Sequence, residues 1–429
     1  MNKFEKLTER LSAQSDTLAI IDSHEHLGPD PDGTWPQFDL CDLIFHNLNA
    51  DLTSAGMPGV GTHAQTPWPA ETTDCSIKWK SIRQYMANIT NMASFRGLLL
   101  GLKELHDFPY NTIDDSNWAM LNEQVVAAYQ KKDWIDYVLK EKCNMKAAII
   151  DMDTIEMDRD YFFPAIKLDY FMMSGLDPAK RKYIESKHDV KITSFEDFMS
   201  CLHSAFEEYV EGGAVAIKSV AAYYRSLFYQ EVARAEVEKM FKLSSDRITP
   251  DMEKSFQNFV MHEICSLTEK KGLPIQFHTG KLAWNFRNIE DTKPTHLINL
   301  LQKYRQLRFD LFHGGYPYTG EFGIIANAFP NAYLDINGLS WTSLEVTKRC
   351  LSEWIELVPQ NKILWGADSY RVLEGVVGQL LYFKKILSEV LAQKVYDGYF
   401  DENFALEIAE KILFKNALNF FSLQERIEI

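Results

Sequence analysis

Two histidines one residue apart are the first candidates for chemistry in this sequence. His24 and His26 lie in the stretch IDSHEHL, which directly follows the apolar run TLAI. Because side chains alternate between the two faces of a β-strand, both imidazoles would project from the same face. Two imidazoles on one face can hold a single metal ion, but such a pair alone is weak evidence for a metal site.

Three further polar residues stand where predicted strands end. His278 closes PIQFH, His313 closes RFDLFH and Asp368 closes KILWGAD. Barrel enzymes place their reacting groups at this carboxyl end of the strands. A lone buried histidine is more often a core residue, but four histidines and an aspartate at equivalent positions favour one shared metal centre. Imidazole and carboxylate ligands suit Zn²⁺ first, and Mn, Fe or Co accept the same ligand types.

A lysine also lies inside an apolar predicted strand. Lys218 occurs in AVAIKS, and burying its ammonium group carries a desolvation cost. The side chain therefore extends to solvent, pairs with a carboxylate, binds substrate or is chemically modified. Carbamylation by CO₂ would make it an anion able to bridge two metal ions. An ion-paired or substrate-binding lysine carries nearly equal weight.

A repeated pattern of apolar strand, polar turn and longer helical segment would position these residues. Eight segments fit a strand: Leu18–Leu27, Met145–Asp153, Phe162–Phe171, Ala214–Tyr223, Pro274–Gly280, Arg308–Tyr316, Ala332–Gly338 and Lys362–Tyr370. Near-continuous apolar strands that alternate with amphipathic helices predict an α/β protein. They favour a closed (β/α)₈ TIM barrel over an open doubly wound sheet.

The predicted barrel is interrupted after its first strand. Residues 28–140 are rich in Trp, Pro and Asn and then become helical, and they are too many for an ordinary connection between a strand and a helix. We predict that residues 1–27 and 141–429 form the barrel and that residues 28–140 form a largely helical insertion covering its mouth. His63, within this insertion, is interpreted as an exposed loop residue.

Composition limits the classes of partner. The formal charge of −15 disfavours nucleic-acid binding, which depends on clustered Lys and Arg. No apolar run approaches the length of a membrane span, and the N-terminal residues are typical of a charged amphipathic helix rather than a signal peptide. Six cysteines without CxxC spacing indicate a reducing compartment, so we expect a cytoplasmic protein with a small-molecule substrate. The sequence leaves open whether the chain forms a homo-oligomer.

The order His-x-His, Lys, His, His, Asp on strands one, four, five, six and eight resembles the amidohydrolase superfamily of metal-dependent barrels. The closest likeness is to the amidohydrolase-2 type domain that in some plants and fungi is fused to a glutamine-synthetase-like domain. The stretches that carry it are GGAVAIKSVAAYYRSL, IQFHTG, LFHGGYPYTGEFGIIANAFPNAYLDING and ILWGADSYR. The resemblance runs from about residue 18 to residue 371 with gaps.

The resemblance implies six ligands around one or two divalent ions: His24, His26, Lys218, His278, His313 and Asp368. In two-metal members the lysine is a carbamylated bridge, and the aspartate is both a ligand and a proton shuttle. One-metal members lack this lysine, and in them the histidine after the sixth strand, here His313, would act as an acid or a base. The presence of Lys218 favours two metals.

Metal-dependent hydrolysis is the activity that these residues would support. Divalent ions acidify water and polarise carbonyl groups, and Asp368 and His313 would be the catalytic residues. We expect an amide, lactone or related bond of a small carboxylated substrate to be cleaved. A non-oxidative decarboxylase or a sugar-acid isomerase is the alternative, and a non-enzymatic binding module is a third hypothesis. Arg225, Tyr224 and Tyr316 are candidate substrate-binding residues at the rim, although a surface role suits the arginine equally.

Overall fold

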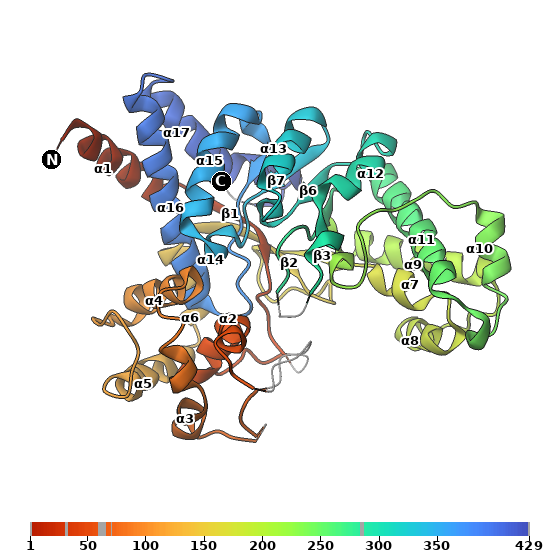
Figure 1. Cartoon of the computed structure of the whole chain (residues 1–429), viewed down its shortest axis with the longest axis horizontal. Coiled ribbons are helices and arrows are strands. Elements are labelled where there is room, and N and C mark those ends of the chain that lie inside the picture. Colours follow the sequence, from red (N-terminus) through yellow and green to blue (C-terminus); the bar gives the residue numbers. More distant parts are fainter. Residues whose placement is uncertain (1, 31–32, 59–65, 70, 284–286, 428–429) are drawn as a thin grey trace.

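Eight parallel strands pair in chain order in the computed structural model of this chain (Figure 1). The structure describes residues 2–30, 33–58, 66–69, 71–283 and 287–427, so His63 lies outside the described residues. The strands are β1 Ile20–Glu25, β2 Met145–Asp151, β3 Phe162–Lys167, β4 Ala216–Ser219, β5 Ile275–Phe277, β6 Phe309–Leu311, β7 Ala332–Asp335 and β8 Ile363–Leu364. Each lies within one of the eight predicted segments.

Backbone hydrogen bonds join the two ends of the sheet. The amide of Ser23 donates to the carbonyl of Trp365 at 3.1 Å, and the amide of Asp368 donates to the carbonyl of His24 at 3.1 Å. These bonds connect the segment that follows β8 to β1, so the eight strands form the (β/α)₈ barrel that the sequence predicts. The strands are shorter than predicted because turns begin at once at the barrel mouth, as in the 3₁₀ turn Ala221–Tyr223 after β4.

Helices also precede β1, connect the strands from β3 onward and follow β8. They are α1 Lys3–Asp16, α7 Asp169–Ser174, α8 Pro178–His188, α9 Phe195–Glu211, α10 Arg234–Met240, α11 Pro250–Lys271, α12 Ile298–Lys303, α13 Thr319–Ala328, α14 Leu339–Thr342, α15 Leu344–Leu357, α16 Leu373–Tyr396, α17 Glu402–Glu410 and α18 Asn416–Phe420. Their ends follow local sequence signals. Ser194 and Asp197 form a capping box at the start of α9, and Gly272, with a φ of +70°, ends α11.

The chain between β1 and β2 is mostly helical. Its helices are α2 Leu40–Ser54, α3 Cys75–Met86, α4 Ala93–His106, α5 Trp118–Tyr129 and α6 Trp134–Asp136, followed by a π-helical turn at Tyr137–Lys142. Figure 1 shows this orange group gathered beside the barrel, and α4 packs along α16. The division of the chain at residues 28 and 140 into two units stays a prediction.

A buried polar group fastens the insertion to α16. His106 Nε2 of α4 lies 2.7 Å from Glu374 Oε1, and the hydroxyl of Tyr129 of α5 donates to Glu374 Oε2 at 2.8 Å. All three side chains are buried, and a buried carboxyl group is stabilised when both oxygens have partners. The helices also approach closely at Gly101, where a Cβ atom would lie 1.8 Å from the carbonyl oxygen of Glu374.

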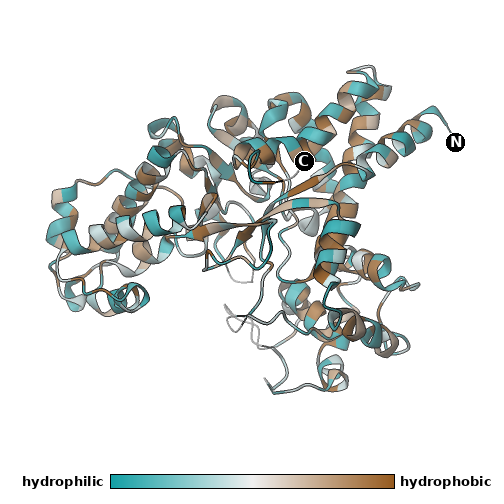
Figure 2. Cartoon of the chain, turned by 180° about the vertical axis from the view of Figure 1, so that it is seen from behind, coloured by the Kyte–Doolittle hydropathy of each residue, from teal (hydrophilic) through white to brown (hydrophobic). Residues whose placement is uncertain are grey.

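A second group of helices follows β3 and β4, and the sequence does not distinguish it from ordinary barrel helices. Figure 1 shows α7 to α11 projecting from the barrel on the side opposite the insertion. Phenylalanine rings fill this group, with Phe198 5.6 Å from Phe241 and 5.3 Å from Phe256 between ring centroids. Figure 2 shows hydrophobic residues concentrated on the strands and hydrophilic residues on outer helix surfaces. Within the described residues, no helix combines the length and apolarity needed to span a membrane.

Candidate active site

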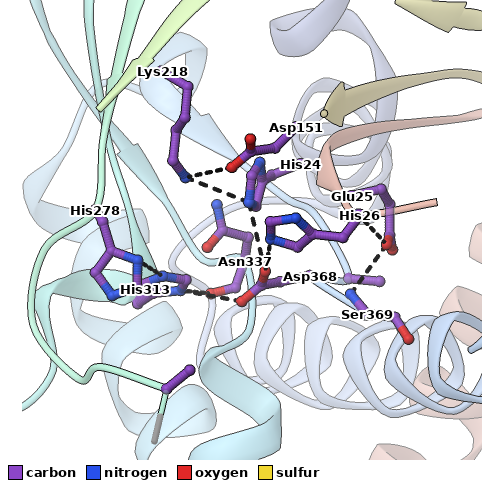
Figure 3. A network of polar contacts seen from close by, with 12 residues as sticks. His24, Glu25, His26, Asp151, Lys218, His278, His313, Asn337, Asp368 and Ser369 are labelled. Atoms are coloured by element: carbon purple, nitrogen blue, oxygen red, sulfur yellow. Dashed lines mark hydrogen bonds and ion pairs between the residues drawn. The ribbon is translucent and has the colours of Figure 1, made fainter. Parts of the chain in front are cut away.

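Polar side chains from six strands converge at the carboxyl end of the barrel. Figure 3 shows the predicted ligands pointing toward one another, together with one carboxylate that the sequence analysis did not single out. The residues brought together are His24, His26, Asp151, Lys218, His278, His313 and Asp368. They form two groups, one around the β1 histidines and one around the histidines after β5 and β6.

Asp368 lies against both histidines of β1. Its Oδ1 atom is 3.6 Å from His24 Nε2 and 3.5 Å from His26 Nε2. These separations are longer than an ordinary hydrogen bond. They match the spacing of ligands around a tetrahedral zinc ion, because ligand distances of about 2.1 Å put neighbouring ligand atoms about 3.4 Å apart. Asp368 Oδ1 therefore lies at the spacing of a shared metal ligand from each of the two histidines.

Asp151 is a further ligand candidate in this first group. Ligand atoms of His24, His26 and Asp151 all lie within 4.8 Å of one another. Asp151 Oδ2 is buried and has no hydrogen-bond partner among the described residues. Asp151 was not among the predicted ligands, although it ends β2, as polar residues end the other strands that supply ligands.

His278 and His313 face each other with unprotonated nitrogens. His278 Nε2 donates to the carbonyl of Lys281 at 2.9 Å, and His313 Nδ1 donates to the carbonyl of Asn337 at 3.0 Å. A carbonyl oxygen only accepts, so these two nitrogens carry the ring protons. In neutral rings, His278 Nδ1 and His313 Nε2 are then bare acceptors 3.1 Å apart. Two such lone pairs repel unless a cation lies against both, so this pair fits a second metal ion held by oriented rings.

Burial keeps these histidines neutral. It lowers the pKa of His24 and His278 well below 6.5 and that of His313 to about 4, and the nearby Lys218 acts in the same direction. Neutral imidazole is the form that binds metal ions. Burial opposes ionisation of Asp368, but the close His26 ring and the nearby His313 lower its pKa. His24, His278, His313 and Asp368 are therefore in the form that binds metal ions at neutral pH.

We expect the metal-free protein to lose stability as the pH falls from about 6.5 toward 4. The unfolded chain protonates these histidines near 6.5, whereas the folded chain keeps them neutral. The unfolded state then binds more protons, so the free energy of unfolding decreases, by about 3 kcal/mol for a shift like that of His313. Urea unfolding of EDTA-treated protein at several pH values measures this. The His278→Asn variant should show a smaller decrease, and an equal decrease would contradict the assignment.

Lys218 lies beside the first ligand group. Its Nζ atom is 3.4 Å from His24 Nε2, 3.9 Å from Asp151 Oδ2 and 3.6 Å from the centre of the Phe312 ring. Burial lowers the pKa of Lys218 to about 8, although Asp151 acts in the opposite direction. A fraction of neutral amine is thus present near neutral pH, and this is the form that reacts with CO₂. Carbamylation of Lys218 stays a prediction.

Buried carboxyl groups of β1 hold the segment that carries Asp368. Asp22 accepts from the amide of Ala367 at 3.2 Å, and Glu25 accepts from the amide of Ser369 at 3.0 Å. These two bonds bracket Asp368 on both sides and support its unusual backbone, which has a φ of +54°. The carboxylate is therefore fixed in direction rather than free to swing on a loop.

Arg225 has protein partners on α11 and in the segment after β4, and its predicted substrate contact stays a prediction. Its guanidinium donates to Asn258 Oδ1 at 2.6 Å, to Gln257 Oε1 at 3.1 Å and to the carbonyl of Phe228 at 2.9 Å. It also lies 4.4 Å from the ring centre of Tyr229. These contacts tie the segment after β4 to α11, which is a positioning role within the fold.

The two predicted substrate-binding tyrosines lie near ligand segments. Tyr224 is 59% exposed and follows Tyr223, whose ring packs against His278 with centroids 4.7 Å apart. Tyr316 is half-buried, and its amide donates to the carbonyl of His313 at 3.1 Å. Tyr316 therefore follows the second ligand group along the chain, and Tyr224 follows a residue that packs against it.

An aromatic contact links the first ligand group to the insertion. Tyr370, two residues after Asp368, lies 5.8 Å from the His26 ring and stacks on His46 of α2 at 5.6 Å between centroids. Tyr370 is half exposed. Helix α2 therefore contributes to the wall beside the ligand cluster.

Sequence comparisons identify related proteins. The amidohydrolase family model matches residues 231–423. Protein fluG of Emericella nidulans is 29% identical over 225 residues, which are 49% of this chain and 26% of that protein. A uronate isomerase of Caldanaerobacter subterraneus subsp. tengcongensis is 25% identical over 190 residues, which are 40% of this chain and 38% of that enzyme. The matches thus span well under half of these relatives.

Solved structures share the barrel along nearly their whole length. Glucuronate isomerase from Caulobacter crescentus has a TM-score of 0.78 at 17% identity and covers 98% of this chain and 95% of its own. Uronate isomerase from Thermotoga maritima has a TM-score of 0.76 at 16% identity and covers 97% of both chains. At such identities the likeness shows the fold alone. The family model covers the part of the chain that carries His278, His313 and Asp368, and with the shared barrel it supports assignment of this chain to the amidohydrolase superfamily.

Proposed function

We propose that this protein is a metal-dependent hydrolase acting on an amide, lactone or related bond of a small carboxylated substrate. The observation that carries the proposal is the pair of bare nitrogens of His278 and His313, which lies next to a separate complete ligand group. Divalent ions held at both groups would acidify water and polarise a carbonyl group. The presence of two ligand groups, with the buried Lys218 beside the first of them, favours hydrolysis over a reaction that needs only one metal ion.

The ligands divide between two ions in this proposal. The first ion would be held by His24, His26 and Asp368, with Asp151 as a further ligand, and the second by His278 and His313. Lys218, as a carbamate, would bridge them. Zn²⁺ is the first choice for nitrogen and carboxylate donors, and Mn, Fe and Co suit the same set.

Asp368 is the proposed proton carrier, with His313 as its neighbour. The lowered pKa of Asp368 keeps it ionised, so it can accept a proton from water and return it to the leaving group. Its Oδ1 atom faces the β1 histidines, and its Oδ2 atom lies 3.7 Å from His313 Nδ1. The backbone bonds on either side of Asp368 hold it in this bridging direction.

A hollow of about 390 Å³ between the insertion and the barrel is proposed to bind the acid group of the substrate. Residues lining it include Asp51, Arg96, Lys281 and Trp341. Arg96 and Lys281 carry two positive charges and Asp51 one negative charge, so the hollow is a positive patch in a protein of net charge −15. The hollow adjoins the ligands, because the carbonyl of Lys281 orients His278 and Trp341 Nε1 donates to the carbonyl of Ala367. Tyr224 and Tyr316 would contact the rest of the substrate.

Isomerisation of a sugar acid is the second candidate function. It is favoured by the structural likeness to two uronate-type isomerases, which extends over 97–98% of this chain and so includes the insertion. One of the sequence relatives is also a uronate isomerase. Decarboxylation stays an alternative that no contact in this structure favours.

Metal analysis combined with product analysis separates the candidates. We expect protein reconstituted with Zn²⁺ to hold two ions per chain and to cleave members of a panel of acidic amides and lactones. Hydrolysis adds the mass of water to the products, whereas isomerisation leaves the mass of the substrate unchanged. One ion per chain, with conversion of D-glucuronate to a product of equal mass, would contradict hydrolysis and support the isomerase.

We also propose a cytoplasmic location. All six cysteines are free and buried, and free thiols are typical of proteins in reducing compartments. The net charge of −15 gives no support for nucleic-acid binding.

A further inference from the structure

Two cysteines of the insertion lie in contact. Cys41 is in the first turn of α2 and Cys75 is the first residue of α3, and their Sγ atoms are 3.2 Å apart. Cys41 is fully buried and Cys75 is 8% exposed. Among the described residues, no other pair of cysteines is in such contact. The two helices that carry them also pack against each other.

The neighbouring charges argue against a metal ion at this pair. The carboxylate of Asp39 lies within ligand reach of both sulfurs. However, Lys78 Nζ already donates to Asp39 Oδ2 at 2.7 Å and to Asp42 Oδ1 at 2.7 Å. The Lys78 ammonium group thus already occupies the Asp39 carboxylate, and its positive charge beside that carboxylate opposes a divalent ion there. Thiol chemistry is what this arrangement leaves to the pair.

We propose that Cys41 and Cys75 form a reversible disulfide, made by exchange with a low-molecular-weight disulfide such as oxidised glutathione. An S–S bond is about 2.05 Å long, so the two sulfurs need to approach by only about 1 Å. Because α2 and α3 are already neighbours, the bond joins surfaces that are in contact in the reduced protein. The proposal does not depend on the catalytic activity of the barrel.

Cys75 is the attacking thiol in this exchange. It is the more exposed of the two, so a small disulfide reaches its sulfur first. Contact with Cys75, burial and nearby carboxylates raise the pKa of Cys41, which therefore keeps its proton in the resting pair.

The exchange has two steps that balance. The Cys75 thiolate attacks one sulfur of the small disulfide, forms a mixed disulfide and releases one small thiolate, which takes up a proton. Cys41 then loses its proton, and its sulfur attacks Cys75 in the mixed disulfide and displaces the second small thiol. Two cysteine thiols are oxidised, and one small disulfide is reduced to two thiols.

The bond would stiffen the part of the insertion that adjoins the ligand cluster. Helix α2 carries His46, which stacks on Tyr370 beside His26. Linking residue 41 to residue 75 also restricts the unfolded chain. We therefore expect the oxidised protein to unfold at a temperature a few degrees higher than the reduced protein.

Thiol counting in glutathione buffers of graded redox ratio tests the proposal. Folded wild-type protein is equilibrated and then denatured in the presence of an alkylating reagent, and the alkylated thiols are counted. The reduced protein should show six thiols, since the chain has six cysteines, and the oxidised protein four, since two are consumed. Dithiothreitol should restore all six, and peptide mapping should recover a linked pair containing Cys41 and Cys75.

Two variants make the result specific. Cys75→Ser should keep all of its thiols in the oxidising buffer, whereas Cys143→Ser, which removes another buried cysteine, should still lose two. Six thiols in folded, oxidised wild type would overturn the proposal, as would a link between other cysteines. A zinc ion bound by wild type and lost in Cys75→Ser, with no disulfide formed, would identify a metal site instead. If Cys75→Ser does not fold, the wild-type peptide map decides.

Discussion

Replacement of Asp368 by asparagine is expected to lower kcat by about 10²–10⁴-fold, the range typical for loss of a general acid–base group. Asparagine has nearly the shape of aspartate, but its amide neither carries the charge that faces His24 and His26 nor takes up a proton from water. The backbone bonds from Ala367 and Ser369 do not involve the altered side chain. Steady-state kinetics on a substrate from the acidic amide and lactone panel measures the effect.

The matched control for this variant is Asp246→Asn. Asp246 is an exposed carboxylate in the helical group after β4, so its replacement changes the net charge equally without touching the ligand cluster. Metal content should be measured for both variants, because partial loss of an ion from Asp368→Asn would also lower the rate. An Asp368→Asn enzyme with wild-type kcat and full metal content would remove Asp368 from the proposed mechanism.

The second large effect is expected from Lys218→Ala. If the lysine is a carbamate bridge, the variant should hold about one metal ion fewer per chain. Its activity should fall by at least about 100-fold, because loss of a group that only supports a metal ligand costs up to about 100-fold. Short carboxylic acids such as acetate should restore part of the metal content and part of the activity, because a free carboxylate can occupy the space left by the carbamate. Metal analysis with and without acetate measures this outcome.

The control variant is Lys146→Ala, because Lys146 is also a strand lysine but its side chain is exposed on β2. Its removal should leave metal content and activity unchanged. Incubation of the protein with ¹³CO₂ should also give a carbamate NMR signal that is absent from the Lys218→Ala protein. Two ions and full activity in Lys218→Ala would show that the lysine does not bridge the metal ions. A single ion and an unmodified lysine in wild type would favour the isomerase.

The residues that converge at the barrel mouth are largely predictable, because their positions follow from strand geometry. A polar residue that closes an apolar run lies at the carboxyl end of a strand, and parallel strands in a closed barrel bring these ends together. This is why His278 and His313, distant in sequence from His24, could be assigned to one cluster. The same rule applies to Asp151, which was missed only because it was not tested against the other strand ends.

Side chains beyond the strand ends are less predictable. Arg225 follows a 3₁₀ turn after β4, where the alternation of faces that fixes direction within a strand no longer applies. Its guanidinium instead binds α11, a contact that depends on tertiary packing. The helical group formed by α7 to α11 was also not foreseen, since an apolar stripe predicts a buried helix face but not the element that covers it.

The position of Tyr370, which lies against His26 and stacks on His46, has a consequence for the evolution of substrate selectivity. The proposed ligands all come from barrel strands, whereas α2 reaches them through one exposed tyrosine ring. Substitutions at His46 or Tyr370 can thus alter which molecules reach the ions while the ligands themselves stay unchanged. A library of variants at these two positions is therefore a direct route to new substrate selectivity. It changes the residues beside the ligand cluster and leaves the proposed metal ligands unchanged.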